Sequence, residues 1–358
     1  DFRRSYEETA YFGEVTYDLT ESLTVAASMR HFDAESYLDG FSGTVWWPCG
    51  GGPSAAAQEA SGVYRPTNNY GADCADSNRI TASKDEVYRF TAEWQATDDV
   101  MIYTAWGEGY RPGGLNRFCS VGNEADYGGQ GRDDATGAGC DFVPDFLTSY
   151  EVGVKASLFD GRMLLNAAAF MQEWDDFQFS RLDVAISPVT LTYNIGQAKS
   201  DGFEADFSAM ISENWSLTGG FSYIEAELSE DYYASDGLAT PTAASGTTLP
   251  RVPDTKWNLS SRYSMDDGWY MQTSYIYTGA SYNNLFDGGS LPTKRYKQKD
   301  YQILNASVGL DKDTWRAELY IRNVTDERGE VFRNAVNWDD RIMTNRPRTL
   351  GASMSLKF

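Results

Sequence analysis

The chain ends in the stretch TLGASMSLKF, residues 349–358, in which apolar and small polar side chains alternate at every step. The apolar members are Leu350, Ala352, Met354, Leu356 and Phe358. Successive side chains of an extended strand point to opposite faces, so this stretch predicts a strand with one apolar and one polar face. Such a strand is typical of a barrel wall that has lipid on one side and water on the other.

The same alternation recurs along the chain in about thirteen segments. They are predicted near 8–17, 23–33, 86–96, 99–109, 148–158, 163–174, 196–211, 216–227, 255–264, 269–278, 300–310, 314–324 and 348–358. An Arg that faced lipid at mid-strand would cost about 2 to 4 kcal/mol. We therefore predict that the mid-strand charges face the lumen; these are Glu14, Arg30, Glu204, Arg262, Glu318 and Arg322.

The connections between these segments alternate between short turns and long links. The long links lie near 34–85, 110–147, 175–195, 228–254, 279–299 and 325–347. Outer-membrane barrels have short periplasmic turns and long extracellular loops, so the prediction places the long links outside the cell and Phe358 in the periplasm. An odd number of antiparallel strands cannot close on itself, so we expect further strands before Asp1.

Composition supports one all-β domain over residues 1–358, a transmembrane antiparallel β-barrel. Aromatic residues make up 14% of the chain, which suits two interfacial belts of rings. The most apolar run, residues 164–171, is far shorter than the roughly 18 to 20 residues that a spanning helix needs. The formal net charge of -22 argues against nucleic acid as a partner, because nucleic-acid binding needs Lys and Arg.

No enzymatic constellation is visible in the sequence. His31 is the single histidine, and no nucleophile, base and orienting acid lie in a recognisable arrangement. The four cysteines fall as Cys49 and Cys74 in one long link and as Cys119 and Cys140 in another, without metal-ligand spacing. We predict two disulfides in an oxidising compartment, with no metal, no cofactor and no catalytic residue.

Six motifs together resemble those of TonB-dependent outer-membrane receptors. They are TAYFGE at 9–14, YTAWGEGYRPGG at 103–114, YEVGVK at 150–155, NIGQAKSDGFE at 194–204, RNVTD at 322–326 and RPRT at 346–349. The resemblance covers nearly the whole chain. It implies the C-terminal part of a barrel of about 22 strands, with the plug domain, the energy-coupling box and the earlier strands outside this sequence.

The resemblance implies active import of a scarce nutrient, foremost a ferric siderophore, across the bacterial outer membrane. The implied partners are the lipid bilayer and lipopolysaccharide, the TonB-ExbB-ExbD system acting through the plug, and a small-molecule ligand. The alternating residues of the terminal strand, including Phe358, would be the signal for the barrel-assembly machinery. Two alternatives stay open, a passive porin-like channel and a structural or adhesive barrel of an envelope assembly.

Aromatic residues and arginines are interleaved in the long links. Rings and guanidinium groups together suit a planar, anionic ligand, through stacking and charge-assisted hydrogen bonds. The predicted ligand contacts are Trp46, Trp47, Tyr110, Arg111, Tyr282 and Arg341. The alternative for most such rings is that they pack the links against one another or belong to the outer aromatic belt.

Overall fold

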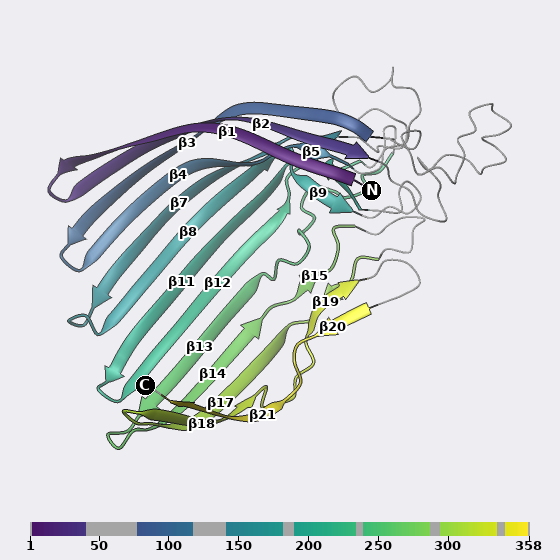
Figure 1. Cartoon of the computed structure of the whole chain (residues 1–358). Coiled ribbons are helices and arrows are strands. Elements are labelled where there is room, and N and C mark those ends of the chain that lie inside the picture. Colours follow the sequence, from purple (N-terminus) through teal and green to yellow (C-terminus); the bar gives the residue numbers. More distant parts are fainter. Residues whose placement is uncertain are drawn as a thin grey trace, which may run out of the picture.

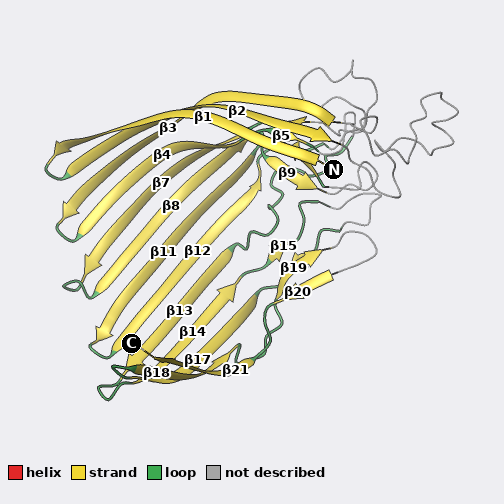
Figure 2. Cartoon of the chain, in the orientation of Figure 1, coloured by secondary structure: helices red, strands yellow, loops and turns green. Residues whose placement is uncertain are grey.

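The structure, a computed structural model, describes residues 2–40, 77–116, 141–181, 190–233, 239–286, 294–334 and 341–356. Thirteen strands form one antiparallel sheet in chain order (Figures 1 and 2), which confirms the predicted all-β class. The strands are β1 (Phe2–Thr20), β2 (Leu23–Gly40), β3 (Ser77–Thr97), β4 (Val100–Arg111), β7 (Asp145–Leu158), β8 (Met163–Asp175), β11 (Ala198–Ser212), β12 (Trp215–Leu228), β13 (Thr255–Ser264), β14 (Trp269–Thr278), β17 (Tyr301–Asp311), β18 (Trp315–Arg322) and β21 (Thr349–Leu356). No helix in this part of the chain is long and apolar enough to cross a membrane.

The sheet is curved, and β1 and β21 are its two edges, which lie far apart (Figure 1). Because neighbouring strands run antiparallel, the first and the thirteenth strand run in the same direction. They therefore cannot pair with each other as the other neighbours do. The short turns lie along one end of the sheet and the long connections along the other.

The strand register gives the sheet one continuous apolar face. Directly opposed residues of an antiparallel pair lie on the same face, and apolar residues are opposed from strand to strand. Leu350 pairs with Ile321, which pairs with Ala306. The same face continues through Leu259, Phe221, Ala205, Ala167, Val154, Ile102, Trp94 and Leu23. We call this surface the apolar face.

The opposite surface, the polar face, carries Ser, Thr, Asn, Gln and charged side chains. On this face, for example, Ser222 pairs with Lys256, Gln272 pairs with Ser307, and Ser307 pairs with Tyr320. All six residues predicted to face the lumen lie here, namely Glu14, Arg30, Glu204, Arg262, Glu318 and Arg322. The six residues thus share one face, and the assignment of that face to a lumen is part of the proposal below.

Strands β2 and β3 extend well into the region predicted as a long link from 34 to 85. The apolar side chains of β2 change sides at this level: Phe32, Ala34 and Leu38 on the polar face are 0%, 2% and 1% exposed, while Asp33 and Glu35 point the other way. Phe32 and Ala34 are buried in a small cluster with Val87, against which Ala10, Tyr110 and Phe146 pack. Farther along the strand, Gly113 O accepts the Ser36 hydroxyl at 3.3 Å. The sequence predicted that this strand ends near residue 33, because the apolar residues of its outer face stop there.

Four short hairpins lie at the long-connection end of the sheet, where the sequence predicted only loops. They are β5 (Gly114–Leu115) with β6 (Asp141–Phe142), β9 (Gln178–Arg181) with β10 (Leu191–Asn194), β15 (Ser281–Tyr282) with β16 (Lys297–Gln298), and β19 (Glu330–Asn334) with β20 (Arg341–Thr344). Elements of two to five residues are too short for a period-two pattern to reveal.

Glycines on the polar face make room for aromatic rings of the neighbouring strand, and Gly309 is the clearest case. A Cβ on Gly309 would overlap the Cζ atom of Tyr270, and the Tyr270 side chain is fully buried. We expect Gly309→Ala to lower the free energy of unfolding by about 1 to 3 kcal/mol, the usual cost of overpacking. Urea unfolding of the refolded protein measures this. Gly109→Ala is the control, because a Cβ there meets nothing within 4 Å, and an equal loss in both variants would contradict the explanation.

Candidate functional site

The connections after β8, β12 and β14 pack together around one apolar core. Its fully buried members include Leu191, Leu228 and Leu285, and Leu249 and Phe286 are nearly so. The Phe286 ring lies 6.2 Å from Phe179 and 5.9 Å from Tyr232, which come from two other connections. The long connections thus form a packed unit that can hold surface side chains in fixed positions.

On this unit lies a group of cations that sit over aromatic rings, which we call the basic-aromatic cluster. It consists of Arg251, Tyr282, Arg295, Tyr296, Lys297, Phe332 and Arg333. The guanidinium carbon of Arg295 lies 3.5 Å and the Lys297 ammonium 6.0 Å from the Tyr282 ring centre. Arg251 lies 4.6 Å over Phe332, and Arg333 lies 3.8 Å over Tyr296. Residues from three connections, after β12, β14 and β18, therefore meet here.

The positions of two arginines in the cluster are fixed by the backbone. Arg295 donates from Nε to Asn284 O at 3.2 Å and from Nη2 to Thr248 O at 3.1 Å. The Arg251 N–H donates to Tyr282 O at 2.7 Å, with a φ of 65° that is uncommon for a residue other than glycine. The side chains of Arg251 and Lys297 remain exposed. Exposed cations beside rings can bind a planar anion.

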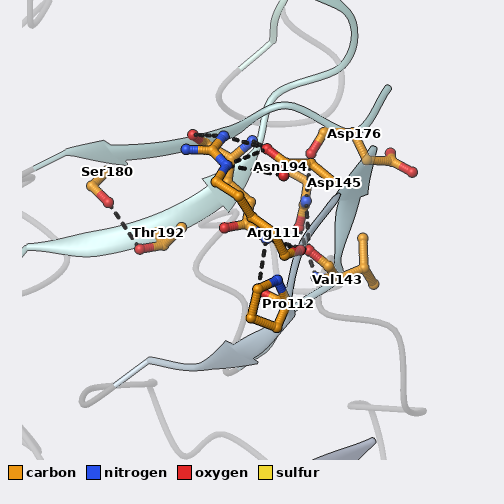
Figure 3. Close-up of polar contacts among 9 residues, drawn as sticks. Arg111, Pro112, Val143, Asp145, Asp176, Ser180, Thr192 and Asn194 are labelled. Carbon is orange, nitrogen blue, oxygen red and sulfur yellow. Dashed lines mark hydrogen bonds and ion pairs between the residues drawn. The ribbon is translucent and has the colours of Figure 1, made fainter. Parts of the chain in front are cut away.

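The predicted ligand residue Arg111 lies in a second polar group, drawn in Figure 3. Its Nε donates to both carboxylate oxygens of Asp145, at 3.0 and 2.9 Å, and its Nη2 donates to the same carboxylate and to Gln178 O at 3.1 Å. The Asp145 side chain is 2% exposed, whereas that of Arg111 is 51% exposed. This pair, which we call the Arg111-Asp145 clasp, ties the end of β4 to the start of β7 and to β9.

Further hydrogen bonds extend the clasp to two hairpins. Asn194 of β10 accepts from Val143 N at 2.9 Å and donates to Val143 O at 3.0 Å and to Asp176 O at 2.6 Å (Figure 3). Asn116, beside β5, exchanges two hydrogen bonds of 2.8 Å with the backbone of Thr192. The structure thus gives Arg111 a role in holding the connections together, and any ligand contact would use its exposed part.

Two of the recognised sequence motifs meet in the connection between β18 and β21, where Asn323 is 3% exposed. Its side chain donates to Glu327 O and Arg346 O and accepts from Glu327 N, each at 2.9 Å, and its own N–H donates to Asn305 Oδ1 at 2.9 Å. The Arg348 N–H donates to Asp326 at 2.8 Å and lowers the pKa of that carboxyl. A hydrogen-bond network around Asn323 therefore joins the RNVTD and RPRT segments.

The other predicted ligand residues lie apart or outside the described residues. Tyr110 stacks on Phe32 with ring centres 3.6 Å apart and is largely occupied by that contact. Arg341 is exposed on β20. Trp46, Trp47, Phe358 and the cysteines Cys49, Cys74, Cys119 and Cys140 lie outside the described residues. Of the predicted ligand residues, Tyr282 alone belongs to the basic-aromatic cluster.

The other six members of the cluster were not among the predicted ligand contacts; they are Arg251, Arg295, Tyr296, Lys297, Phe332 and Arg333. A signal was present, because residues 294–299 read KRYKQK in a chain whose net charge is -22. Such a concentration of cations in an acidic protein indicates an anionic partner. Within the described ranges, no three His, Cys, Asp or Glu residues gather in a way that could hold a metal ion.

Comparisons with known proteins support the fold described above. A family model described as "TonB dependent receptor-like, beta-barrel" matches residues 1–324. The probable TonB-dependent siderophore receptor PiuA of Acinetobacter baumannii is 24% identical over 244 residues, which cover 67% of this chain and 30% of that protein. The chain therefore spans about a third of the length of this curated relative.

Two solved structures share the fold. The ferric yersiniabactin uptake receptor FyuA from Yersinia pestis superposes with a TM-score of 0.70 at 18% identity, over 100% of this chain and 46% of that one. The ferric-catecholate import receptor Fiu from E. coli gives a TM-score of 0.71 at 19% identity, over 99% and 45%. At these identities the likeness concerns the fold alone.

Proposed function

Because the chain belongs to the TonB-dependent receptor-like β-barrel family, we propose that it forms the wall and ligand-binding connections of an outer-membrane receptor that imports a ferric siderophore with energy supplied through TonB. Its relatives include the probable TonB-dependent siderophore receptor PiuA, the metal-pseudopaline receptor CntO and the catecholate siderophore receptor Fiu. The single observation that carries the proposal is the basic-aromatic cluster, which presents cations and rings on a rigid unit above a sheet with an apolar face.

The orientation and the partners follow from the same proposal. The apolar face contacts lipid, the polar face lines the lumen, and the long connections lie outside the cell beside lipopolysaccharide. The terminal strand, with Leu350, Met354 and Leu356 on the apolar face, is the segment that the barrel-assembly machinery recognises. TonB, ExbB and ExbD act through a plug that lies outside these residues. The proposal includes no catalytic step.

The first test is ligand binding by the complete receptor. We expect that Arg251→Gln combined with Lys297→Gln weakens binding of an iron(III) tris-catecholate chelate about tenfold or more, or at least about 1.4 kcal/mol. Both side chains are exposed, so their replacement leaves the connections folded. Binding of radioactive chelate to cold cells measures the affinity. Lys312→Gln, in the short turn before β18, is the control for the loss of a cation away from the cluster.

The same assay separates the alternatives. A siderophore receptor predicts saturable binding and uptake that stops when the proton gradient is collapsed. A passive porin-like channel predicts uptake that does not saturate at low concentration and survives the uncoupler, and a structural or adhesive barrel predicts neither binding nor uptake. Equal affinity of the double variant and the wild type would remove the basic-aromatic cluster from the ligand site.

A further inference from the structure

The polar face of the sheet is divided by charge. Within strands β1 to β11 carboxylates prevail on it; they are Glu8, Glu14, Asp18, Asp85, Glu93, Glu151, Glu204 and Asp206, against the cations Arg4, Arg30, Arg89 and Lys155. On strands β13 to β18 the described polar-face cations are Lys256, Arg262, Arg316 and Arg322, and the carboxylates are Asp311 and Glu318.

The cations of β13 and β18 are spread over the whole height of the sheet. Lys256 pairs with Thr278 and Arg322 with Thr349, both at the long-connection end. Arg262 pairs with Gln272, nearer the short turns, and Arg316 pairs with Ser355. We call Lys256, Arg262, Arg316 and Arg322 the basic track. Its upper end lies below the connections that carry the basic-aromatic cluster, since these connections follow β12, β14 and β18.

The carboxylates of this wall are at the short-turn end, and Glu318 is engaged there. It accepts the Tyr270 hydroxyl at 2.5 Å and pairs with Arg316 at 3.4 Å. Arg262 lies 3.8 Å over the Tyr270 ring, so both lower arginines are anchored on one buried tyrosine. Asp311, opposite Arg316, is at the same level. The upper cations Lys256 and Arg322 are exposed.

A cleft connects the upper and lower parts of the track. It has a volume of about 330 Å³ and is lined by Gln272, Ser274, Asn305, Ser307, Arg316, Glu318 and Arg322, among others. The lining consists of neutral hydrogen-bonding groups, two guanidinium groups and one carboxylate, Glu318, which Tyr270 and Arg316 already bind. The guanidinium and neutral groups suit an anion with several oxygen atoms. The corresponding cleft on the other wall has three carboxylates and two cations in its lining, Glu93, Glu108, Glu151, Arg89 and Lys155.

We propose that the basic track is the route by which an anionic ligand passes along the wall after it leaves the basic-aromatic cluster. The inference rests on the proposed function and adds the side of the lumen that the ligand follows. Charge supports this occupant, because an anion is attracted by the β13 to β18 wall and repelled by the carboxylates of β1 to β11. Continuity supports it too, since the track begins below the proposed binding surface.

The test uses the complete receptor in cells and the iron(III) tris-catecholate chelate as the probe. We expect Lys256→Gln with Arg322→Gln to slow energised uptake at saturating chelate about tenfold, the lower range of electrostatic steering effects, while the affinity of cold cells stays within about twofold. Lys256→Arg with Arg322→Lys keeps the charges and should restore the rate. Arg89→Gln with Lys155→Gln removes two cations from the opposite wall and should leave uptake unchanged.

Three results would overturn the route. Unchanged uptake in the Lys256 and Arg322 variant, with binding intact, rejects it and leaves the proposed function standing. An equal loss of uptake rate in the Arg89 and Lys155 variant would show that uptake requires charges on both walls, and this result also rejects the route. Absence of chelate binding by the wild type rejects the anionic ligand class, and the route with it. Heat-modifiable migration of each variant in gels verifies that the barrels are folded and equally abundant.

Discussion

Replacing Asn323 with alanine is expected to lower the free energy of unfolding by about 3 kcal/mol. The side chain is buried and serves Glu327 N, Glu327 O and Arg346 O, and each buried polar group left without a partner costs about 1 to 3 kcal/mol. The residue also has a φ of 53°. An alanine is less favourable than an asparagine in that left-handed conformation, by about 1 kcal/mol.

Urea unfolding of the refolded protein, followed by tryptophan fluorescence, measures this loss. Asn258→Ala is the matched control, because Asn258 is exposed on the polar face of β13 and its loss should change stability by less than about 0.5 kcal/mol. Limited proteolysis should also cut the Asn323 variant faster between β18 and β21. A variant as stable as the wild type would show that the hydrogen-bond network around Asn323 contributes nothing to the free energy of unfolding.

Placing an arginine at Met354 is expected to block assembly, whereas placing one at the neighbouring Ser353 is expected to be tolerated. Met354 is 70% exposed on the apolar face, opposite Ala317. In lipid an arginine there costs about 2 to 4 kcal/mol. Ser353 lies on the polar face opposite Glu318, where a guanidinium group meets water and a carboxylate.

The pair of substitutions isolates the face, because the new residue, the strand and the depth are nearly the same. The amount of folded receptor in the outer membrane, and its free energy of unfolding in lipid, are the measurements. Met354→Leu keeps the apolar character and should behave as the wild type. Similar amounts of folded Met354→Arg and Ser353→Arg receptor would show that the apolar face does not contact lipid.

The sequence predicted the thirteen strands because each membrane segment repeats the same alternation, as Leu350 to Leu356 does in β21. The ends of β2 and β3 could not be predicted in this way, because Phe32 and Leu38 are apolar toward the polar face. The hairpins escaped for another reason. Two residues such as Ser281 and Tyr282 form a strand only through their partners Lys297 and Gln298, and such partners cannot be read from a local pattern.

The members of the candidate site were predicted only in part, and its role as a ligand site stays a prediction. Interleaved rings and arginines indicated an anion site, and Tyr282 does lie under Arg295. Arg111 was chosen by the same reasoning, yet its guanidinium group is bound to Asp145, which is distant in sequence. Asn323 gave no signal beyond its motif, since a single asparagine does not reveal four hydrogen bonds made across the fold. The hydrogen-bond partners of Arg111 and Asn323 are set by the tertiary structure and cannot be read from the local sequence.

In the orientation proposed above, the change of sides in β2 would set the depth of the protein in the bilayer. Below the change, Val25, Ala27 and Met29 face the same way as Asp33 and Glu35 do above it. A shift of the sheet into the bilayer by two residues, about 7 Å, would place Asp33 in hydrocarbon. A shift of the same size in the opposite direction would expose Met29 to water. The side-chain pattern of β2 therefore marks the level of the boundary between hydrocarbon and water. A bilayer whose thickness does not match this level must deform locally.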